Sequence, residues 1–236
     1  MALIVIHFPQ TVKEYAEAEI CPGRTVSVPE CCPTCQVEGE MIRWGRYKRS
    51  VKTGEAKYEL QIQRVRCQAC GRSQALLPDF LHPYRHYLLS LLQKAIWLYL
   101  FVGLGIERLI ERLPPAGPEP STVQEWVRSF GYGAGYLLLD VLRRFVMSLY
   151  AESDLSGRAP LELERSGNAE QLKKSYHFWR WGEILYARQK EVEPHMSFSD
   201  AQFFPFLVRW LQSQSIVPRI FWSPRLARTP TAPFTP

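Results

Sequence analysis

The sequence has no long hydrophobic run and no secretory leader pattern. Its longest apolar stretch, residues 95–106, spans 12 residues, whereas a membrane-spanning helix needs about 20. The first residues lack the basic segment and the apolar core of a signal peptide. We therefore expect a cytoplasmic protein with no membrane-spanning helix, and we interpret residues 95–106 as part of a buried helix.

The motifs of common catalytic sites are also absent. The sequence contains no nucleotide-binding P-loop, no dinucleotide-binding fingerprint and no G-x-S-x-G nucleophile motif. Its five histidines show no metal-binding spacing. His82 and His86 are four residues apart, but Pro83 between them argues against a shared helical face. We therefore predict that the protein is not an enzyme.

Cysteine is too scarce for a secreted disulfide scaffold, with six in 236 residues. Four of the six form two pairs, Cys32-Pro-Thr-Cys35 and Cys67-Gln-Ala-Cys70. Two C-x2-C pairs are typical of a four-cysteine zinc site, which is closed to substrate and therefore structural. Gly71, directly after the second pair, suits the left-handed backbone of such a turn. We predict that Cys32, Cys35, Cys67 and Cys70 hold a structural Zn²⁺.

Two other uses of the cysteines fit the sequence less well. Disulfides are disfavoured by the low cysteine content, and a redox dithiol normally has one C-x2-C pair at the start of a helix. Both pairs here lie next to turn residues. Cys21 and Cys31 are left over, and Cys31 competes with its neighbour Cys32 as a metal ligand.

Acidic residues are few in the segment that carries the cysteines. Residues 41–72 contain nine basic and two acidic residues, which indicates a polyanionic partner. Alternating patterns at 42–51 and 58–66 flank the turn signal Lys52-Thr-Gly-Glu55 and predict an antiparallel hairpin with one apolar and one basic face. A solvated hairpin face is the alternative. The basic face is predicted to contact DNA through Arg43, Arg46, Lys48, Arg49, Arg64 and Arg66.

Helical patterns dominate after residue 88. Helices are predicted at 88–102, 105–113 and 121–130, the last beginning at Ser121 with Gln124 completing a capping box. This last helix has an apolar back and a polar front, as a DNA recognition helix requires. Its predicted base-contacting residues are Thr122, Gln124, Glu125 and Arg128, and Ser129 shares the polar front. Glycines at 131–135 are expected to separate it from a largely buried helix at 136–150.

The predicted fold class is α+β, a zinc-ribbon β-hairpin followed by a helix-turn-helix-like bundle. The expected order is a strand and a short helix (1–30), the zinc ribbon (31–75), the helical domain (76–150), a helical C-terminal region (151–222) and a disordered tail (223–236). In this order, residues 77–87 are an extended connector and 153–168 a linker.

The stretch from Cys32 to Tyr87 resembles the zinc-ribbon and helix-turn-helix front end of bacterial insertion-sequence transposases. It is also similar to uncharacterised bacterial proteins that carry this region alone. The resemblance rests on the two cysteine pairs, Trp44-Gly-Arg-Tyr-Lys-Arg49, Arg64-Val-Arg66, Leu77-Pro-x-Phe80 and Pro83-Tyr-Arg-x-Tyr87. It implies binding to terminal DNA repeats.

Two departures from this family matter. The link at 114–120 is longer than a standard helix-turn-helix turn. The acidic catalytic core of such transposases has no counterpart, because Asp140 lies in a helical pattern and Asp154 and Asp200 lie in polar segments. If the chain is a truncated transposase, its catalytic part is either lost or supplied by another chain, so a separate catalytic transposase chain or another protein is the expected partner.

The sequence thus predicts a zinc-dependent protein that binds double-stranded DNA and is associated with a mobile element. A protein-docking module or transcriptional regulator is the alternative. Structured RNA also stays open, because Trp44 and Tyr47 can stack unpaired bases.

Overall fold

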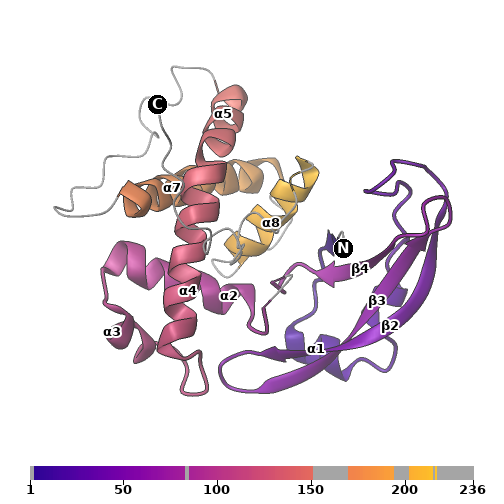
Figure 1. Ribbon diagram of the computed structural model, residues 1–236, viewed down its shortest axis with the longest axis horizontal. Coiled ribbons are helices and arrows are strands. Elements are labelled where there is room, and N and C mark those ends of the chain that lie inside the picture. Colours follow the sequence, from indigo (N-terminus) through magenta and orange to yellow (C-terminus); the bar gives the residue numbers. More distant parts are fainter. Residues whose placement is uncertain (1–2, 83–84, 151–169, 194–201, 215, 217–236) are drawn as a thin grey trace. The chain divides into compact units, whose positions relative to one another are not determined.

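The computed structural model describes residues 3–82, 85–150, 170–193, 202–214 and 216 (Figure 1). It has a mixed sheet and many helices, so the predicted α+β class is confirmed. The chain forms two compact units. The first contains residues 1–91, 114–117 and 204–217, and the second contains the remainder. The predicted linker at 153–168 and the predicted tail at 223–236 lie outside the described residues.

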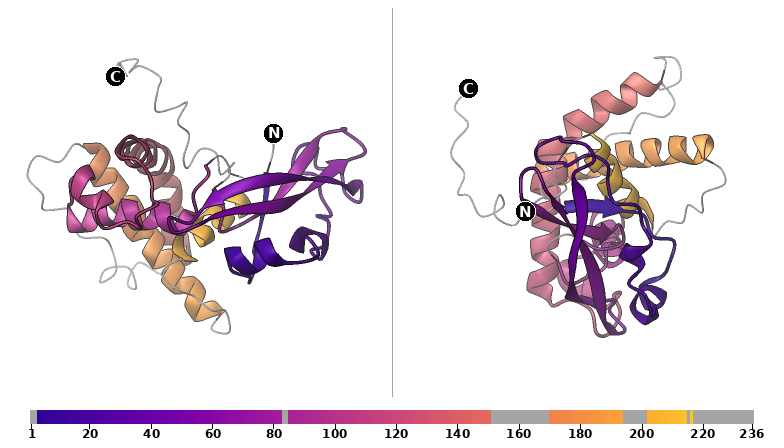
Figure 2. Two further views of the ribbon diagram at one scale, coloured as in Figure 1. Left: turned by 90° about the horizontal axis from the view of Figure 1, so that it is seen from below. Right: turned by 90° about the vertical axis from the view of Figure 1, so that its right-hand side faces the viewer.

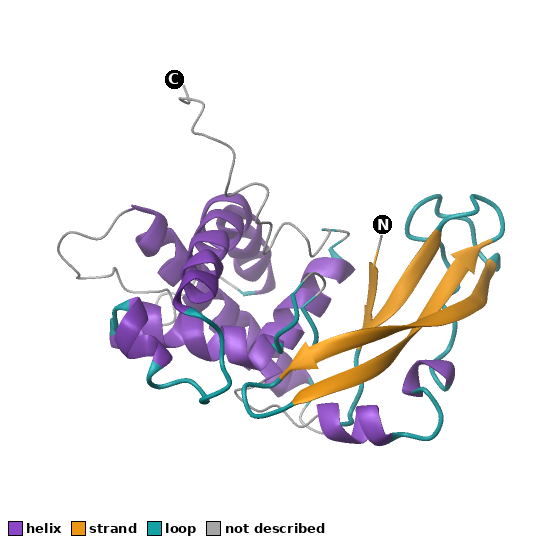
Figure 3. Ribbon diagram, turned by 60° about the horizontal axis from the view of Figure 1, so that its bottom comes forward, coloured by secondary structure: helices purple, strands orange, loops and turns teal. Residues whose placement is uncertain are grey.

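The first unit contains a four-stranded sheet in the order β1-β4-β3-β2 (Figure 3). Its strands are β1 (Leu3–Ile6), β2 (Met41–Lys52), β3 (Lys57–Cys67) and β4 (Ser73–Pro78). β1 pairs with β4 in parallel, and the other pairs are antiparallel. β2 and β3 form the hairpin that the alternation predicts. β4 overlaps the predicted connector; it is buried from residue 74 to 78 and so shows no alternation.

Both faces of this sheet carry a hydrophobic cluster. On one face, Leu60, Ile62 and Ala75 pack against Tyr15 of α1 (Val12–Glu17), and we call this the helix face. Figure 2 shows α1 on one side of the sheet. We call the other the knuckle face; its Met41, Val65 and Leu76 pack against Cys32. Burial on two faces explains how a short sheet forms a core.

The segment between β1 and the cysteine turns contains the short helix α1, whose N-terminus is capped. Thr11 caps α1, because its hydroxyl accepts from the Glu14 N–H at 3.3 Å and the Glu14 carboxylate accepts from the Thr11 N–H at 2.7 Å. The helix ends at Glu17, and Ile20, which follows it, is 62% exposed. A 3₁₀ helix, η1 (Pro22–Arg24), follows.

The helix α8 (Phe203–Ser213) holds the edge strand β1, although 207 residues separate the contacting positions. The Gln212 side chain accepts from the Val5 N–H at 2.5 Å and donates to the Val5 carbonyl at 3.3 Å. Arg209 pairs with the buried carboxylate of Asp79, which also contacts His7 Nδ1 at 2.8 Å. The amide of Gln212 thus occupies backbone groups that an edge strand otherwise leaves open.

The second unit is helical among its described residues. α2 (Leu89–Trp97), which begins in the first unit, continues as the π-helix η2 (Leu98–Val102). α3 (Ile106–Ile110) and α4 (Pro120–Phe130) follow. The π-helix η3 (Gly131–Leu138) leads into α5 (Leu139–Leu149), and α7 (Glu170–Val192) comes next. No helix in the described part of the chain is long and apolar enough to cross a membrane.

The predicted start of α4 is wrong. The helix begins at Pro120, its N-cap is Glu119, and no side chain caps it. Proline is favoured at the first helical position because its fixed φ suits a helix and its missing N–H would have no partner there. The capping box predicted for Ser121 and Gln124 therefore does not form.

The predicted break at residues 131–135 is also wrong. These residues stay helical as η3, because their glycines allow close packing against α7. A Cβ at Gly135 would lie 3.0 Å from the Ser175 backbone nitrogen and 3.1 Å from its hydroxyl. The following helix is less buried than predicted: Leu138, Leu142 and Val146 are buried, whereas exposed apolar residues include Leu137, Met147 and Leu149.

This packing predicts that Gly135→Ala destabilises the helical unit. Replacing a helical glycine by alanine ordinarily stabilises by about 0.5–1 kcal/mol. Here the new methyl group meets backbone that cannot move aside, so we expect a loss of about 1–3 kcal/mol in unfolding free energy, measured by urea denaturation. Gly105→Ala, with no atom within 4 Å of its Cβ, is the control and should cost about 0.5 kcal/mol as a weaker N-cap. Stabilisation by Gly135→Ala would contradict this account.

Candidate metal centre

Two turns with the same hydrogen-bond pattern position the cysteine pairs. The N–H four residues after the first cysteine donates to that cysteine's carbonyl, from Gln36 to Cys32 at 2.8 Å and from Gly71 to Cys67 at 2.9 Å. Gln36 and Gly71 both have left-handed backbone, with φ of 61° and 70°. Each turn therefore folds back and directs two sulfurs to one side.

The four predicted cysteines come together at one end of the hairpin. All four Sγ atoms lie within 4.8 Å of one another, with Cys32–Cys70 at 3.8 Å and Cys35–Cys67 at 3.7 Å. A tetrahedral site with Zn–S bonds of about 2.3 Å has sulfur–sulfur edges of about 3.8 Å. All six cysteines are free thiols. The arrangement can hold a metal ion and fits a tetrahedral thiolate site.

Donors around the sulfurs favour thiolates. The Thr34 N–H donates to Cys32 Sγ at 3.4 Å, and the Cys70 N–H donates to Cys67 Sγ at 3.5 Å. The Gln74 amide also donates to Cys32 Sγ at 3.7 Å and is fully buried. Sequence reasoning missed Gln74, although a lone amide within the apolar run of β4 is a recognisable signal. Such outer contacts orient the ligands of metal sites.

The thiols do not ionise independently. Burial raises the pKa of Cys32, but hydrogen bonds from the backbone of Cys35 and Thr34 outweigh it and lower the pKa to about 6. A backbone hydrogen bond from Val37 lowers the pKa of Cys35, yet burial and the neighbouring sulfurs raise it to about 12. One thiolate thus suppresses the next, and a bound cation would remove that competition.

The two remaining cysteines stay outside the cluster. The Cys31 thiol donates to the Gln36 side-chain oxygen at 3.5 Å, and Cys21 is buried with its thiol donating to the Gln61 carbonyl at 3.0 Å. Neither belongs to the group of cysteines that can share an ion. The expected competition from Cys31 is therefore absent from this arrangement of the described residues.

The predicted single basic face is wrong, because the strand register divides its six cations between both faces. Arg49 lies opposite Leu60 and Arg64 opposite Ala75, on the helix face, and Arg66 shares that face with Arg64. Arg43, Arg46 and Lys48 lie opposite Val65, Gln63 and Gln61, on the knuckle face. Alternation alone puts the neighbours Lys48 and Arg49 on opposite faces. A bulge between Arg43 and Arg46, where Gly45 has φ of 70°, shifts the alternation by one residue and so brings Arg43 to the face of Arg46 and Lys48.

Several of these cations bind other parts of the protein. Arg43 donates to the carbonyls of Arg24 and Val26 at 2.9 and 2.7 Å. Arg49 is half-buried and donates to the carbonyls of His82 and Arg85, and burial lowers its pKa. Their guanidinium groups therefore anchor loops.

The other predicted cations have looser contacts. Arg64 donates to the Ser73 hydroxyl at 2.6 Å, and Arg66 donates to the Gly71 carbonyl at 3.1 Å. Lys48 and Glu59 form an ion pair of 2.7 Å, and both side chains are more than half exposed. Arg46 is exposed. Arg46 and Lys48 are thus the predicted cations that point most freely toward solvent.

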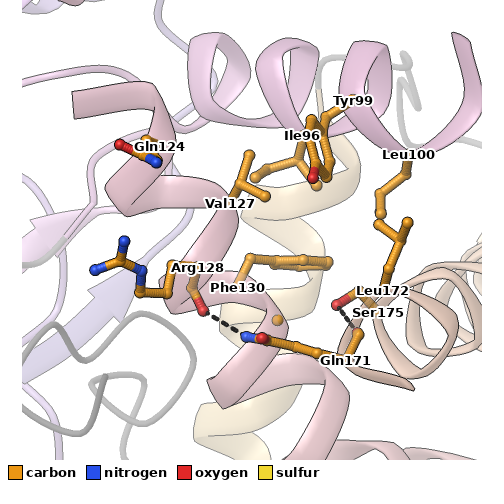
Figure 4. Close-up of a pocket in the computed structure, with 11 residues that line it drawn as sticks. Ile96, Tyr99, Leu100, Gln124, Val127, Arg128, Phe130, Gln171, Leu172 and Ser175 are labelled. Atoms are coloured by element: carbon orange, nitrogen blue, oxygen red, sulfur yellow. Dashed lines mark hydrogen bonds between the residues drawn. The ribbon is translucent and has the colours of Figure 1, made fainter. Parts of the chain in front are cut away.

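The predicted base-contacting residues all lie on α4, in the second unit. Gln124 and Arg128 are exposed, Thr122 and Glu125 are half-buried, and Ser129, also predicted on the polar front, is buried. Gln124 and Arg128 lie at the edge of a hollow of about 230 Å³ that Phe130, Leu172 and Ser175 also line (Figure 4). The Gln171 amide donates to the Arg128 carbonyl at 3.1 Å across its rim.

One family model covers this cluster. A family model described as Domain of unknown function (DUF6431) matches residues 32–98. The matched segment begins at Cys32 and includes all four clustered cysteines, strands β2 to β4 and α2. No curated protein and no solved structure matches the chain.

We predict that Cys67→Ser abolishes stoichiometric zinc binding and unfolds the ribbon. Metal binding contributes about 10–16 kcal/mol to the folding of small zinc sites, so losing one ligand removes most of that stabilisation. Zinc content by mass spectrometry and the tryptophan emission spectrum measure the two effects. Cys31→Ser is the matched control and should retain one zinc per chain. Loss of zinc in both variants would contradict the four-cysteine assignment.

The two left-handed positions predict opposite effects of reciprocal substitutions. Gln36→Gly should tighten zinc binding several-fold, because a non-glycine residue in this conformation costs about 1–2 kcal/mol. Gly71→Gln should weaken binding by a similar factor; space is not the cause, since a Cβ there lies 3.7 Å from Arg66. Competition with a chromophoric chelator measures both affinities. Equal affinities of the two variants and the wild type would show that backbone strain does not matter here.

Proposed function

We propose that the protein is a zinc-dependent protein that binds double-stranded DNA. The observation that carries the proposal is the four-sulfur cluster at one end of a hairpin rich in cations. By alternation, the knuckle face of that hairpin presents Arg46, Lys48 and Lys52 from β2 and Lys57 from β3, all exposed. Glu59 is the acidic residue on the same face.

The spacing of these cations suits a phosphate backbone. Six residues of a β-strand span about 20 Å, so the side chains of Arg46 to Lys52 form a stripe of that length. Cations in such a stripe neutralise phosphates and release counterions, which gives affinity without reading sequence. The zinc ion takes no part in contact; it fixes the turns that end the hairpin.

In this proposal, α4 is the element that recognises the DNA sequence. Gln124 and Arg128 are exposed on it, and amide and guanidinium groups are the side chains that bind adenine and guanine edges. The link from α3 to α4, residues 111–119, is longer than a standard helix-turn-helix turn. We therefore propose major-groove contact by α4 without that exact geometry.

The resemblance to insertion-sequence transposases supports a role in a mobile element. In that role the protein recognises DNA ends, and a separate chain supplies the catalytic carboxylates.

A protein-docking module is the second candidate, and exposed apolar side chains favour it. Tyr136, Leu137, Met147 and Leu149 are each more than 40% exposed around η3 and α5. Exposed apolar residues that lie together mark interaction sites. A docking module predicts stable association with a protein and weak, non-specific affinity for DNA.

The proposal predicts that Lys48→Ala weakens binding to every duplex about equally. Each lost phosphate contact should reduce the slope of log affinity against log salt by about 0.9. Fluorescence anisotropy with a random-sequence duplex, with and without a zinc chelator and across a salt series, measures this. The chelator should abolish tight binding.

Lys13→Ala is a closely matched control for this experiment. Its side chain is 67% exposed and lies near Glu17, as that of Lys48 is 69% exposed and pairs with Glu59. Lys13 is on α1, away from the knuckle face, so its removal should leave affinity and slope unchanged. Micromolar or weaker binding that is indifferent to zinc and to DNA sequence would favour the docking module.

A further inference from the structure

An exposed tryptophan lies on the other face of the hairpin. Trp44 is 48% exposed, and Ile42, two residues before it on the same strand, is 36% exposed. Ile42 lies opposite Arg66, and the Arg66 guanidinium lies over the Trp44 ring, so Ile42 and Trp44 are on the helix face. They lie near the end of the hairpin that carries the cysteine turns. Large apolar side chains that remain exposed are informative, because burying one stabilises a protein substantially.

The bulge and a neighbouring arginine hold this ring in place. Trp44 directly precedes Gly45, whose left-handed backbone forms the bulge, and bulges redirect side chains. The Arg66 guanidinium lies 4.7 Å from the centre of the Trp44 ring, and its Nε is fixed by the Gly71 carbonyl at 3.1 Å. One side of the indole is therefore covered by a cation, while nearly half of the side chain stays open to solvent.

We propose that Trp44 is a stacking site for an unpaired nucleobase, so that the ribbon binds single-stranded nucleic acid as well as duplex. An indole backed by a guanidinium offers a flat, polarisable surface, and every base has a π-face that fits it. Arg64 shares the face and supplies positive charge for the adjacent phosphates. Tyr47 is half-buried against the core cluster of the helix face, which leaves Trp44 as the aromatic platform on this strand.

This inference rests on the proposed nucleic-acid binding but uses a different face. The duplex stripe of Arg46, Lys48 and Lys52 lies on the knuckle face, whereas Trp44 and Arg66 lie on the helix face. The two surfaces can therefore be separated by mutation. A segment where duplex gives way to single strand would engage both.

The test compares a 12-nucleotide oligo(dT) with a blunt duplex of random sequence by fluorescence anisotropy, using the zinc-loaded full chain. We expect Trp44→Ala to weaken oligo(dT) binding about tenfold with the salt slope unchanged, since base stacking is not ionic. Duplex affinity should stay within about twofold, because phosphate contacts dominate it. Trp44→Phe should keep most of the oligo(dT) affinity.

Two controls make the outcome decisive. Trp97→Ala removes a tryptophan of similar exposure, 44%, from the second unit and should change neither affinity. Zinc content must be equal in all variants, which shows that the ribbon is intact. Equal effects of Trp44→Ala on duplex and oligo(dT), or no effect on either, would overturn the stacking site while the proposed function stands. If the wild type bound neither oligo(dT) nor duplex, the stacking site and the proposed function would both be overturned.

Discussion

The proximity of four sulfur atoms is the constraint on which the ribbon depends. Cys32 and Cys67 are fully buried in the cluster of the knuckle face, so the sulfurs join a segment with almost no regular structure to the end of a strand. Thiols this close cannot all ionise unless a cation is shared among them. Folding of the turns, ionisation of the sulfurs and metal affinity are thus one coupled equilibrium. That equilibrium therefore fixes the end of the hairpin at which the two cysteine turns lie.

Local signals were enough to predict the hairpin and the cysteine cluster. C-x2-C spacing, a turn between alternating segments and a glycine after the second pair each act over a few residues. Both hairpin strands extend one residue beyond the predicted bounds at each end. Part of the division of the cations also follows from local pattern, because the neighbours Lys48 and Arg49 must lie on opposite faces of a strand. The face of Arg43 was not predictable in this way, since one extra residue at Gly45 reverses the alternation and nothing in a run such as Arg43-Trp-Gly-Arg46 distinguishes a bulge from a regular strand.

The helical region shows where distant contacts override local preference. Glycines at 131 and 135 read as a helix break because glycine weakens isolated helices. In the fold they are required by the approach of α7, whose sequence lies about 40 residues further on. Gln74 beside a thiol and Arg209 beside Asp79 are likewise defined by partners that no local window contains.

The hydrogen bonds between Gln212 and Val5 have a consequence for the synthesis of the protein on the ribosome. Gln212 is added 207 residues after Val5, so β1 is made long before the side chain that completes its edge. Until then, the hydrogen-bonding groups of that edge are open to any extended chain nearby, including the same strand of another nascent copy. The sheet is therefore among the first parts of the protein to be made, but the edge of β1 is covered only once α8 has been made. Loss of α8 would leave that edge free to pair with another chain, on an otherwise folded sheet.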